Sequence, residues 1–367
     1  MMKIYLKYIL KELIQPFIFG IGAFTAIFVG TDILFRLADF YSNFDVSILT
    51  TVELFLLSLP QIIVYTFPMA TLLATILAYS RLNGDSEITA FRAGGFSLRK
   101  LILPALIVGL LASFGGIAIN EFVVPEANYR YSQMVYEFQH GGEERPRTQY
   151  DLFLTPLDSA TNRPEFILYT RRFSADDGEM EVVNLQEYED GRPARLIEAD
   201  RAVWREDGWQ FYDGQIYQLR AGDRVARMDF SEYIVRAEIE SPDRIAELDR
   251  DTDEMTLWEL SEYIAVMRSQ GRDVFEERVF WHQKISVPFA SFIFALMAAP
   301  LGMKPKRQGG SATGMGLSVI IIFIYYGLMT LGDAMGSQGA ISPWLGAWLQ
   351  NIVFAGVGSV LLYKTGR

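Results

Sequence analysis

The sequence has no cysteine and only two histidines among its 367 residues. Without cysteine, the chain forms neither disulfide bonds nor thiolate metal sites. His140 and His282 lie in different surroundings, no G-x-S-x-G pattern surrounds a serine, and no G-x-x-x-x-G-K-[ST] phosphate loop occurs. We therefore expect that the chain is not an enzyme, binds no cofactor or metal, and hydrolyses no ATP by itself.

Lysine is missing from the whole centre of the chain. Residues 121–283 carry 36 Asp/Glu and 19 Arg but no Lys, a net charge of −17, which leaves +6 for the remainder. A single soluble domain has no reason to separate its charge in this way. A chain that crosses a membrane and holds one large domain on the far side does.

Six long apolar runs surround this acidic centre. A hydrocarbon core about 30 Å thick needs about 20 apolar residues per helix, and each run meets that length. A buried helix in a soluble core is the alternative for any single run, but six such runs favour membrane spans. The expected spans are residues 13–35, 54–79, 101–120, 281–303, 313–332 and 344–363.

Basic residues at the span ends predict the orientation, because cytoplasmic flanks keep the positive charge. The N-terminus, the loops after spans two and four, and the C-terminal tail hold 12 basic residues against three acidic ones. The opposite loops, 36–53 and 333–343, have Arg36 as their single basic residue. Both termini are therefore expected in the cytoplasm and the acidic centre outside. Residues 1–12, with lysines at i, i+4 spacing, predict an amphipathic helix on the inner headgroup surface.

Residues 124–255 predict an external all-β domain. Short segments of β-favouring residues alternate with Asp-Gly turn signals such as Asp177-Gly178 and Asp213-Gly214, which indicates a meander or a jelly-roll-like domain. Trp209 and Phe211 are expected on one face, as are Met228, Phe230 and Ile234. These apolar faces fill either a closed core or an open trough for an acyl chain. Residues 256–280 predict a connecting helix that begins with a capping box of Thr256 and Glu259.

The cytoplasmic loop 81–100, between spans two and three, is long for a simple turn. Residues 86–93 predict a short helix that Gly94-Gly95 ends. Glu87 and Arg92 would face the cytoplasm, while Ile88 and Phe91 form an apolar side suited to docking on another protein. The alternative is a solvated loop.

The acidic residues near the spans bear on the class of transporter. Asp32, Glu53 and Asp333 all lie near outer span ends, and no acidic residue is expected at the midplane of the membrane, which disfavours an ion-coupled carrier.

Several short motifs then resemble a known family. The run Phe67-Pro68-Met69-Ala70-Thr71-Leu72-Leu73-Ala74, the segment Ser86 to Gly95, and Asn120 to Pro125 look like the lipopolysaccharide export permeases of the LptF/LptG (YjgP/YjgQ) family. The resemblance extends to span four with Pro288 and Pro300, and the three-plus-three arrangement around an external β-domain also matches. The first and third of these motifs lean toward the LptG half of the family.

This resemblance implies a bacterial inner-membrane permease with its β-domain in the periplasm. Two permeases, paralogues or copies, would form a V-shaped cavity driven by a cytoplasmic LptB-like ATPase dimer that binds ATP and Mg²⁺. Lipopolysaccharide would pass to LptC-like and LptA-like β-jelly-roll proteins, and no nucleic acid is involved. An envelope scaffold or sensor is the competing reading, distinguished by whether ATP hydrolysis moves lipid to the β-domain.

The resemblance also suggests residue roles. Glu87 matches the acidic residue that meets the ATPase, and Arg36 matches a basic position that contacts lipid A phosphates. A guanidinium pairs well with phosphate, although an arginine at a span end also serves as a snorkelling anchor. The expected substrate-binding residues are Arg36, Phe28, Phe35, Phe211 and Phe230. The expected ATPase-coupling residues are Arg81, Glu87, Ile88, Phe91 and Arg92.

Overall fold

The computed structural model divides the chain into a helical unit, residues 1–139 with 275–367, and a second unit, residues 140–274. The residues that it describes are 2–44, 46–139, 148–156, 164–189, 191–205, 208–220, 224–235, 239–247, 250–269, 272–303 and 311–366. These ranges leave out His140, a further turn signal of the sequence at Gly222-Asp223, and four of the 12 basic flank residues, namely Lys304, Lys306, Arg307 and Arg367.

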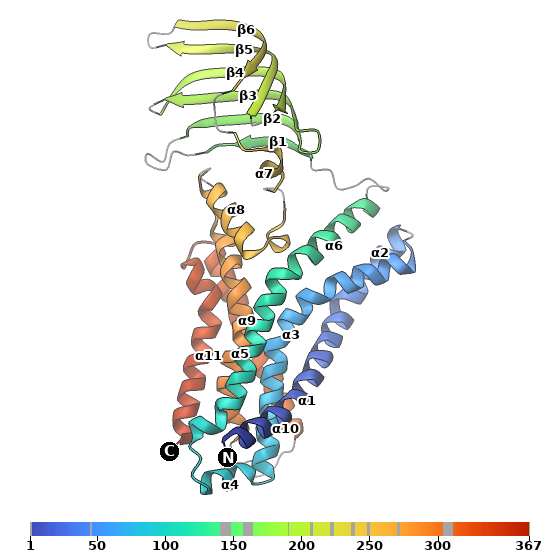
Figure 1. Cartoon of the computed structure of the whole chain (residues 1–367), viewed down its shortest axis with the longest axis vertical. Coiled ribbons are helices and arrows are strands. Elements are labelled where there is room, and N and C mark those ends of the chain that lie inside the picture. The colour runs from blue at the N-terminus through green and yellow to red at the C-terminus, as the bar shows by residue number, and fades with distance from the viewer. Residues whose placement is uncertain are drawn as a thin grey trace. The chain divides into compact units, whose positions relative to one another are not determined.

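The helical unit contains all the expected spans (Figure 1). Its elements are α1 (Met2–Phe28), the π-helical turn η1 (Val29–Ile33), α2 (Leu34–Phe44), α3 (Ile48–Gly84), α4 (Glu87–Ala93), α5 (Leu98–Phe122), α6 (Val124–Gln139), α9 (Phe275–Gly302), α10 (Ser311–Ser337) and α11 (Pro343–Gly366).

Six helical segments of the described chain are long and apolar enough to cross a membrane, as predicted. Helices α3 and α9 form the centre of the unit: 78% and 72% of the residues in their apolar 18-residue stretches are buried. The segment α1–η1–α2 and helix α10 lie outside, with only 17% and 22% buried. Small residues allow close packing: a methyl group at Gly109 of α5 would lie 2.8 Å from the carbonyl oxygen of Ser291 in α9.

Residues 124–139 differ from the prediction, because they form helix α6 of the helical unit and not the start of the β-domain. Met134 and Phe138 of α6 pack against Leu37 and Phe40 of α2. The prediction of a separate surface helix at residues 1–12 also differs from the structure, which describes this segment from Met2 on. These residues continue into span one as α1, and their apolar side, including Ile9, is buried within the bundle.

The second unit is built on one antiparallel sheet in which each strand pairs with its neighbours in the sequence, a meander. The strands are β1 (Thr148–Leu154), β2 (Phe166–Ser174), β3 (Glu179–Glu189), β4 (Arg192–Arg205), β5 (Gly208–Arg220) and β6 (Arg224–Ile234). They are followed by α7 (Pro242–Glu247), the short 3₁₀ turn η2 (Thr252–Glu254) and α8 (Leu257–Ser269).

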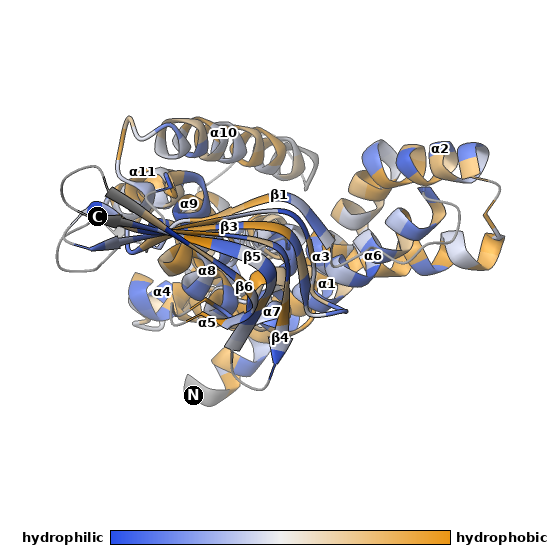
Figure 2. Cartoon of the chain, turned by 90° about the horizontal axis from the view of Figure 1, so that it is seen from above, coloured by the Kyte–Doolittle hydropathy of each residue, from blue (hydrophilic) through white to orange (hydrophobic). Residues whose placement is uncertain are grey.

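All six strands bend at the same level of the sheet. Asp151, Val182 and Asp213, on β1, β3 and β5, have φ between 52° and 54°, a left-handed conformation that residues other than glycine adopt uncommonly. Each ladder lacks its pairing at this level, while the pairs on both sides are regular. Figure 2 looks across the sheet from β6 toward β1 and shows the resulting sharp turn of the strands. The predicted hairpin at Asp213-Gly214 is therefore wrong: the positive φ bends β5 instead of ending it.

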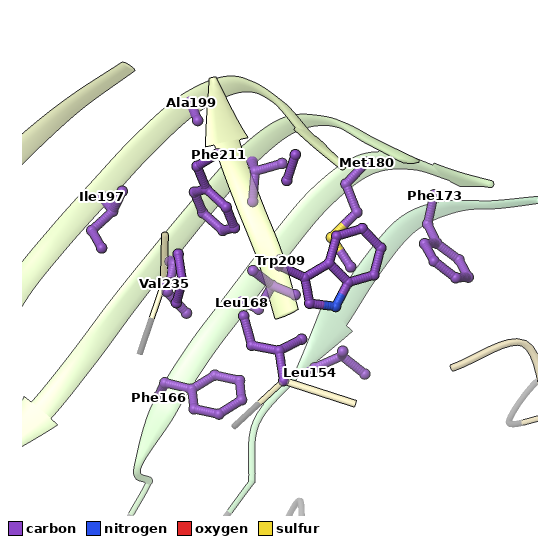
Figure 3. Packing of buried hydrophobic residues seen from close by; sticks show 14 of the residues in the cluster. Leu154, Phe166, Leu168, Phe173, Met180, Ile197, Ala199, Trp209, Phe211 and Val235 are labelled. Carbon is purple, nitrogen blue, oxygen red and sulfur yellow. The ribbon is translucent and has the colours of Figure 1, made fainter. Parts of the chain in front are cut away.

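The bend folds one face of the sheet around an apolar core (Figure 3). On β3 the inward residues are Met180, then Val183 and Leu185, so the two-residue alternation shifts by one at the bend. On β6, Phe230 and Tyr233 on either side of the bend pack against the core, so the expectation is wrong for Ile234, which is 67% exposed. Met228 lies before the bend, two residues from Phe230, and is 59% exposed on this last strand of the described sheet.

Helix α7 and the segment before it complete this core. Ile239 and Ile245 are buried in the cluster, and the Trp209 indole N–H donates to the carbonyl of Glu240 at 2.9 Å. Arg244 donates to Glu262 of α8 at 2.6 Å, and this bond holds the pKa of the Glu262 carboxyl below its usual value.

Helix α8 begins with the capping box that the sequence predicts. The amide of Thr256 donates to the carboxylate of Glu259 at 2.7 Å, and the amide of Glu259 donates to the Thr256 hydroxyl at 3.2 Å. Helix α8 ends at Ser269 and span four begins as α9 at Phe275, so the predicted connecting helix 256–280 is divided.

Candidate functional site

Helix α4 lies in the loop between α3 and α5, where the sequence predicts a short helix. The helix ends at Gly94 and Gly95, and Gly95 has a left-handed φ of +84°. The Phe96 amide then donates to the Phe91 carbonyl at 3.0 Å. Its first turn is less well supported: Ser86 adopts a left-handed φ of 59° and its side chain caps no amide. A seven-residue helix of this kind depends on packing for its position.

That packing comes from the apolar side of α4. Ile88 is buried, and Phe91 packs edge-on to Tyr5 of α1 with ring centroids 4.9 Å apart. These two residues therefore anchor the helix to the bundle and do not form an outward docking face. The outward side carries Thr89, Ala90 and Arg92, which are exposed.

The acidic residue of α4 has a partner from the first span. The Tyr8 hydroxyl of α1 donates to Glu87 Oε1 at 2.9 Å. Close by, Arg81 at the end of α3 forms an ion pair with Glu12 of α1 at 2.7 Å and lies 3.7 Å from Asp85. The structure thus brings Arg81 and Glu87 to the same end of α1, with Glu87 still partly exposed.

Arg36 lies at the other end of span one, on α2 just after the π-helical turn. It is exposed and forms an ion pair with Asp32, one turn earlier. Phe35 is 67% exposed beside it, whereas Phe28 is partly buried against the apolar cluster that contains Ile33 and Leu54. The sequence did not reveal the π-helical turn η1, a feature that often occurs at functional positions.

The two aromatic residues proposed for the β-domain differ in position. Phe211 is fully buried among the core side chains, and Phe230 is partly buried at the border of the cluster. In this structure the inner face of the sheet is filled by its own side chains and by those of α7. Of the two residues, Phe230 is the one that a ligand could reach without unpacking the core.

A buried polar network joins α9, α10 and α11. The Tyr325 hydroxyl donates to Asn351 Oδ1 at 2.9 Å, and Asn351 Nδ2 donates to the Ser286 carbonyl at 2.7 Å. The Ser286 hydroxyl in turn donates to the Ala347 carbonyl at 2.7 Å. Interhelical hydrogen bonds of this kind fix helix packing within a membrane. Nothing in the sequence pattern pointed to these residues as a group.

Asn120 has a specific structural partner across the bundle. Pro288 has no amide N–H, so the carbonyl of Lys284, four residues earlier in α9, lacks its helical donor. Asn120 Nδ2, from α5, donates to this carbonyl at 3.0 Å. The proline within span four was a signal that such a carbonyl needs a partner, but the sequence did not tell which side chain supplies it.

A model of a known protein family matches nearly the whole chain. Residues 7–364 match the model of the lipopolysaccharide export system permease LptF/LptG. The chain belongs to this family. Members of the LptF/LptG family are transport components, and the six apolar helices with an inserted β-sheet unit agree with that membership.

Curated relatives come from both halves of the family. The chain is 22% identical over 317 residues to the lipopolysaccharide export system permease protein LptG of Escherichia coli (strain K12), with 84% of each chain covered. It is 21% identical over 326 residues to LptF of the same strain, covering 83% of this chain and 80% of LptF. These values differ too little to assign the chain to either half.

Proposed function

We propose that this chain is the permease subunit of an ABC-type exporter that extracts lipopolysaccharide from the inner membrane and passes it to a periplasmic bridge of β-jelly-roll proteins. The observation that carries the proposal is the family match over residues 7–364, which includes both sets of spans and the inserted β-unit. A separate cytoplasmic ATPase dimer, which binds ATP and Mg²⁺, supplies the energy.

The charge distribution supports an orientation for this exporter. The loop that carries α4 is rich in basic residues, and the lysine-free β-unit is strongly acidic. Both termini and α4 then face the cytoplasm, and the β-unit faces the periplasm. Helix α4 meets the ATPase through Glu87 and Arg92, and Arg36 meets the lipid phosphates.

Two exposed surfaces of this chain support its pairing with other proteins. The segment α1–η1–α2 and helix α10 are apolar and little buried, which supports pairing with a second LptF/LptG-type permease. In the described sheet, β1 and β6 each have a neighbouring strand on one side. A sheet edge accepts a strand from another protein, which supports docking of LptC-like and LptA-like β-domains.

Two substitutions test the function in a complex purified with its ATPase. Glu87→Arg is expected to lower the amount of bound ATPase and the ATP turnover stimulated by lipopolysaccharide. Arg36→Glu is expected to lower the amount of copurified lipopolysaccharide while the ATPase stays bound. A complex in which both variants keep wild-type lipid and turnover would contradict these roles.

The orientation is tested separately in intact cells. Because the chain has no cysteine, a single Ser231→Cys on the exposed side of β6 or a single Thr89→Cys on α4 gives one labelling site each. A membrane-impermeant maleimide should label position 231 once it passes the outer membrane, and position 89 only after lysis. The reverse pattern would reject the proposed topology.

A further inference from the structure

The cytoplasmic end of α1 presents one side to the coupling loop. Tyr5, Tyr8 and Glu12 are spaced at i, i+3 and i+7, which places them on one face of a helix. Each contacts the loop or its ends: Tyr5 packs on Phe91, Tyr8 donates to Glu87, and Glu12 pairs with Arg81. Figure 1 shows the N-terminal turns of α1 beside α4.

This face is held firmly in the bundle. The hydroxyls of Tyr5 and of Tyr79, from α1 and α3, both donate to the carbonyl of Leu101 in α5, at 2.8 Å and 2.7 Å. Ile9 and Leu13 of α1 are fully buried in the same cluster. The start of α1 therefore packs as one unit with α3 and α5, and the short helix α4 lies against it.

Among the three contacts, that of Tyr8 is the one made to the group proposed to meet the ATPase. A carboxylate accepts several hydrogen bonds, so Glu87 can bind a partner through its other lone pairs while one lone pair of Oε1 accepts from Tyr8. A hydroxyl donating to an ionised carboxylate is stronger than a neutral hydrogen bond and restricts the rotamer of the glutamate. Without it, the long glutamate side chain at a strained helix start has greater freedom.

We propose that Tyr8 is a positioning residue that fixes the Glu87 carboxylate for the ATPase and ties α4 to span one. The proposal rests on the proposed function. It has a mechanical consequence: α1, η1 and α2 continue as one helical segment from Tyr8 to Arg36, a length of about 40 Å at the rise of a helix. A displacement of α4 is thus passed along span one to the Arg36–Asp32 pair.

A double-mutant cycle in the permease–ATPase complex tests the positioning role. Tyr8→Phe keeps the ring and removes only the hydroxyl, and it should weaken binding of the ATPase about two- to tenfold, as expected for one net hydrogen bond. In a Glu87→Ala background, which lacks the acceptor of the Tyr8 hydroxyl, the same change should have less than half of that effect on a logarithmic scale. Tyr5→Phe, which removes a hydroxyl bonded to Leu101 instead, should combine additively with Glu87→Ala.

The outcomes of the cycle separate the two proposals. If Glu87→Ala weakens ATPase binding but Tyr8→Phe is silent, or has the same effect in both backgrounds, the positioning role is wrong and the proposed function stands. If no ATPase binds the wild-type chain, the proposed function fails and takes the positioning role with it.

A reporter at the outer end of span one tests the mechanical consequence. Ala38 is exposed on α2, and Ala38→Cys carries a spin label in a chain without other cysteines. Adding ATP to the complex should change the mobility of the label, and Tyr8→Phe should reduce this change by at least half at saturating ATPase. An equal response in Tyr8→Phe would overturn the transmission through α1.

Discussion

The hydrogen bond between Asn120 and the Lys284 carbonyl allows a test of how the bundle tolerates a proline in span four. Asn120→Leu keeps the branched shape of the side chain but removes the donor, so the Lys284 carbonyl, which Pro288 cannot serve as a helical donor, loses the hydrogen bond from Asn120. Hydrogen bonds between membrane helices contribute about 0.6 kcal/mol on average and up to about 1.7. Because Asn120 is only partly buried, we expect destabilisation by about 1 kcal/mol.

Pro288→Ala provides the matched control. Alanine restores the amide that donates to the Lys284 carbonyl, so Asn120→Leu should cost almost nothing in this background. Pro288→Ala also removes ring contacts with Gly116, but that loss is common to both arms of the cycle and cancels. Unfolding in mixed detergent micelles, followed by tryptophan fluorescence, gives the four free energies. Additivity within about 0.3 kcal/mol would refute the proposed compensation.

The remaining predictions concern packing and pH. Phe211→Ala should destabilise the β-unit by about 3–5 kcal/mol in thermal melts followed by near-UV circular dichroism, and a loss below about 1 kcal/mol would mean that this face is not a packed core. Gly332→Ala places a methyl group against the backbone oxygen of Gly346 in α11 and should cost about 1–3 kcal/mol in detergent unfolding, whereas Gly327→Ala, with open space around it, should be near neutral. Because Arg244 lowers the pKa of Glu262, this carboxylate stabilises the fold above its unfolded pKa of about 4.3 and loses that contribution as the pH falls below it. The melting temperature of wild type should therefore fall more between about pH 5 and pH 3 than that of Glu262→Gln, and parallel curves would contradict this.

The sequence predicted the helical unit well because apolar length alone decides whether a helix crosses a membrane. The capping box at Thr256 and the helix at 87–93 were also predictable, since both depend on local residue types. The β-unit was predicted only in outline. The left-handed residues at its bend, such as Val182, shift the inward alternation within each strand, so a period-two pattern could not place Ile234 correctly.

The candidate sites show the same limit. Charge patterns singled out Arg36 and Glu87. The partner of Arg36, Asp32, lies four residues earlier and agrees with helical spacing, whereas the partner of Glu87, Tyr8, comes from another helix and only the fold identifies it. The apolar side of α4 was recognised, but its direction was not, because sequence periodicity does not tell whether a face meets the same chain or another one.

The most direct test of the export function follows lipid into the β-unit. A photoreactive phenylalanine at position 230, at the border of the apolar core, is placed in the complex with the partner permease and ATPase in lipopolysaccharide-containing proteoliposomes. We predict a crosslink to lipopolysaccharide that needs ATP hydrolysis and that disappears with Glu87→Arg. A crosslink of equal yield without ATP, or none under any condition while the ATPase turns over, would contradict the account.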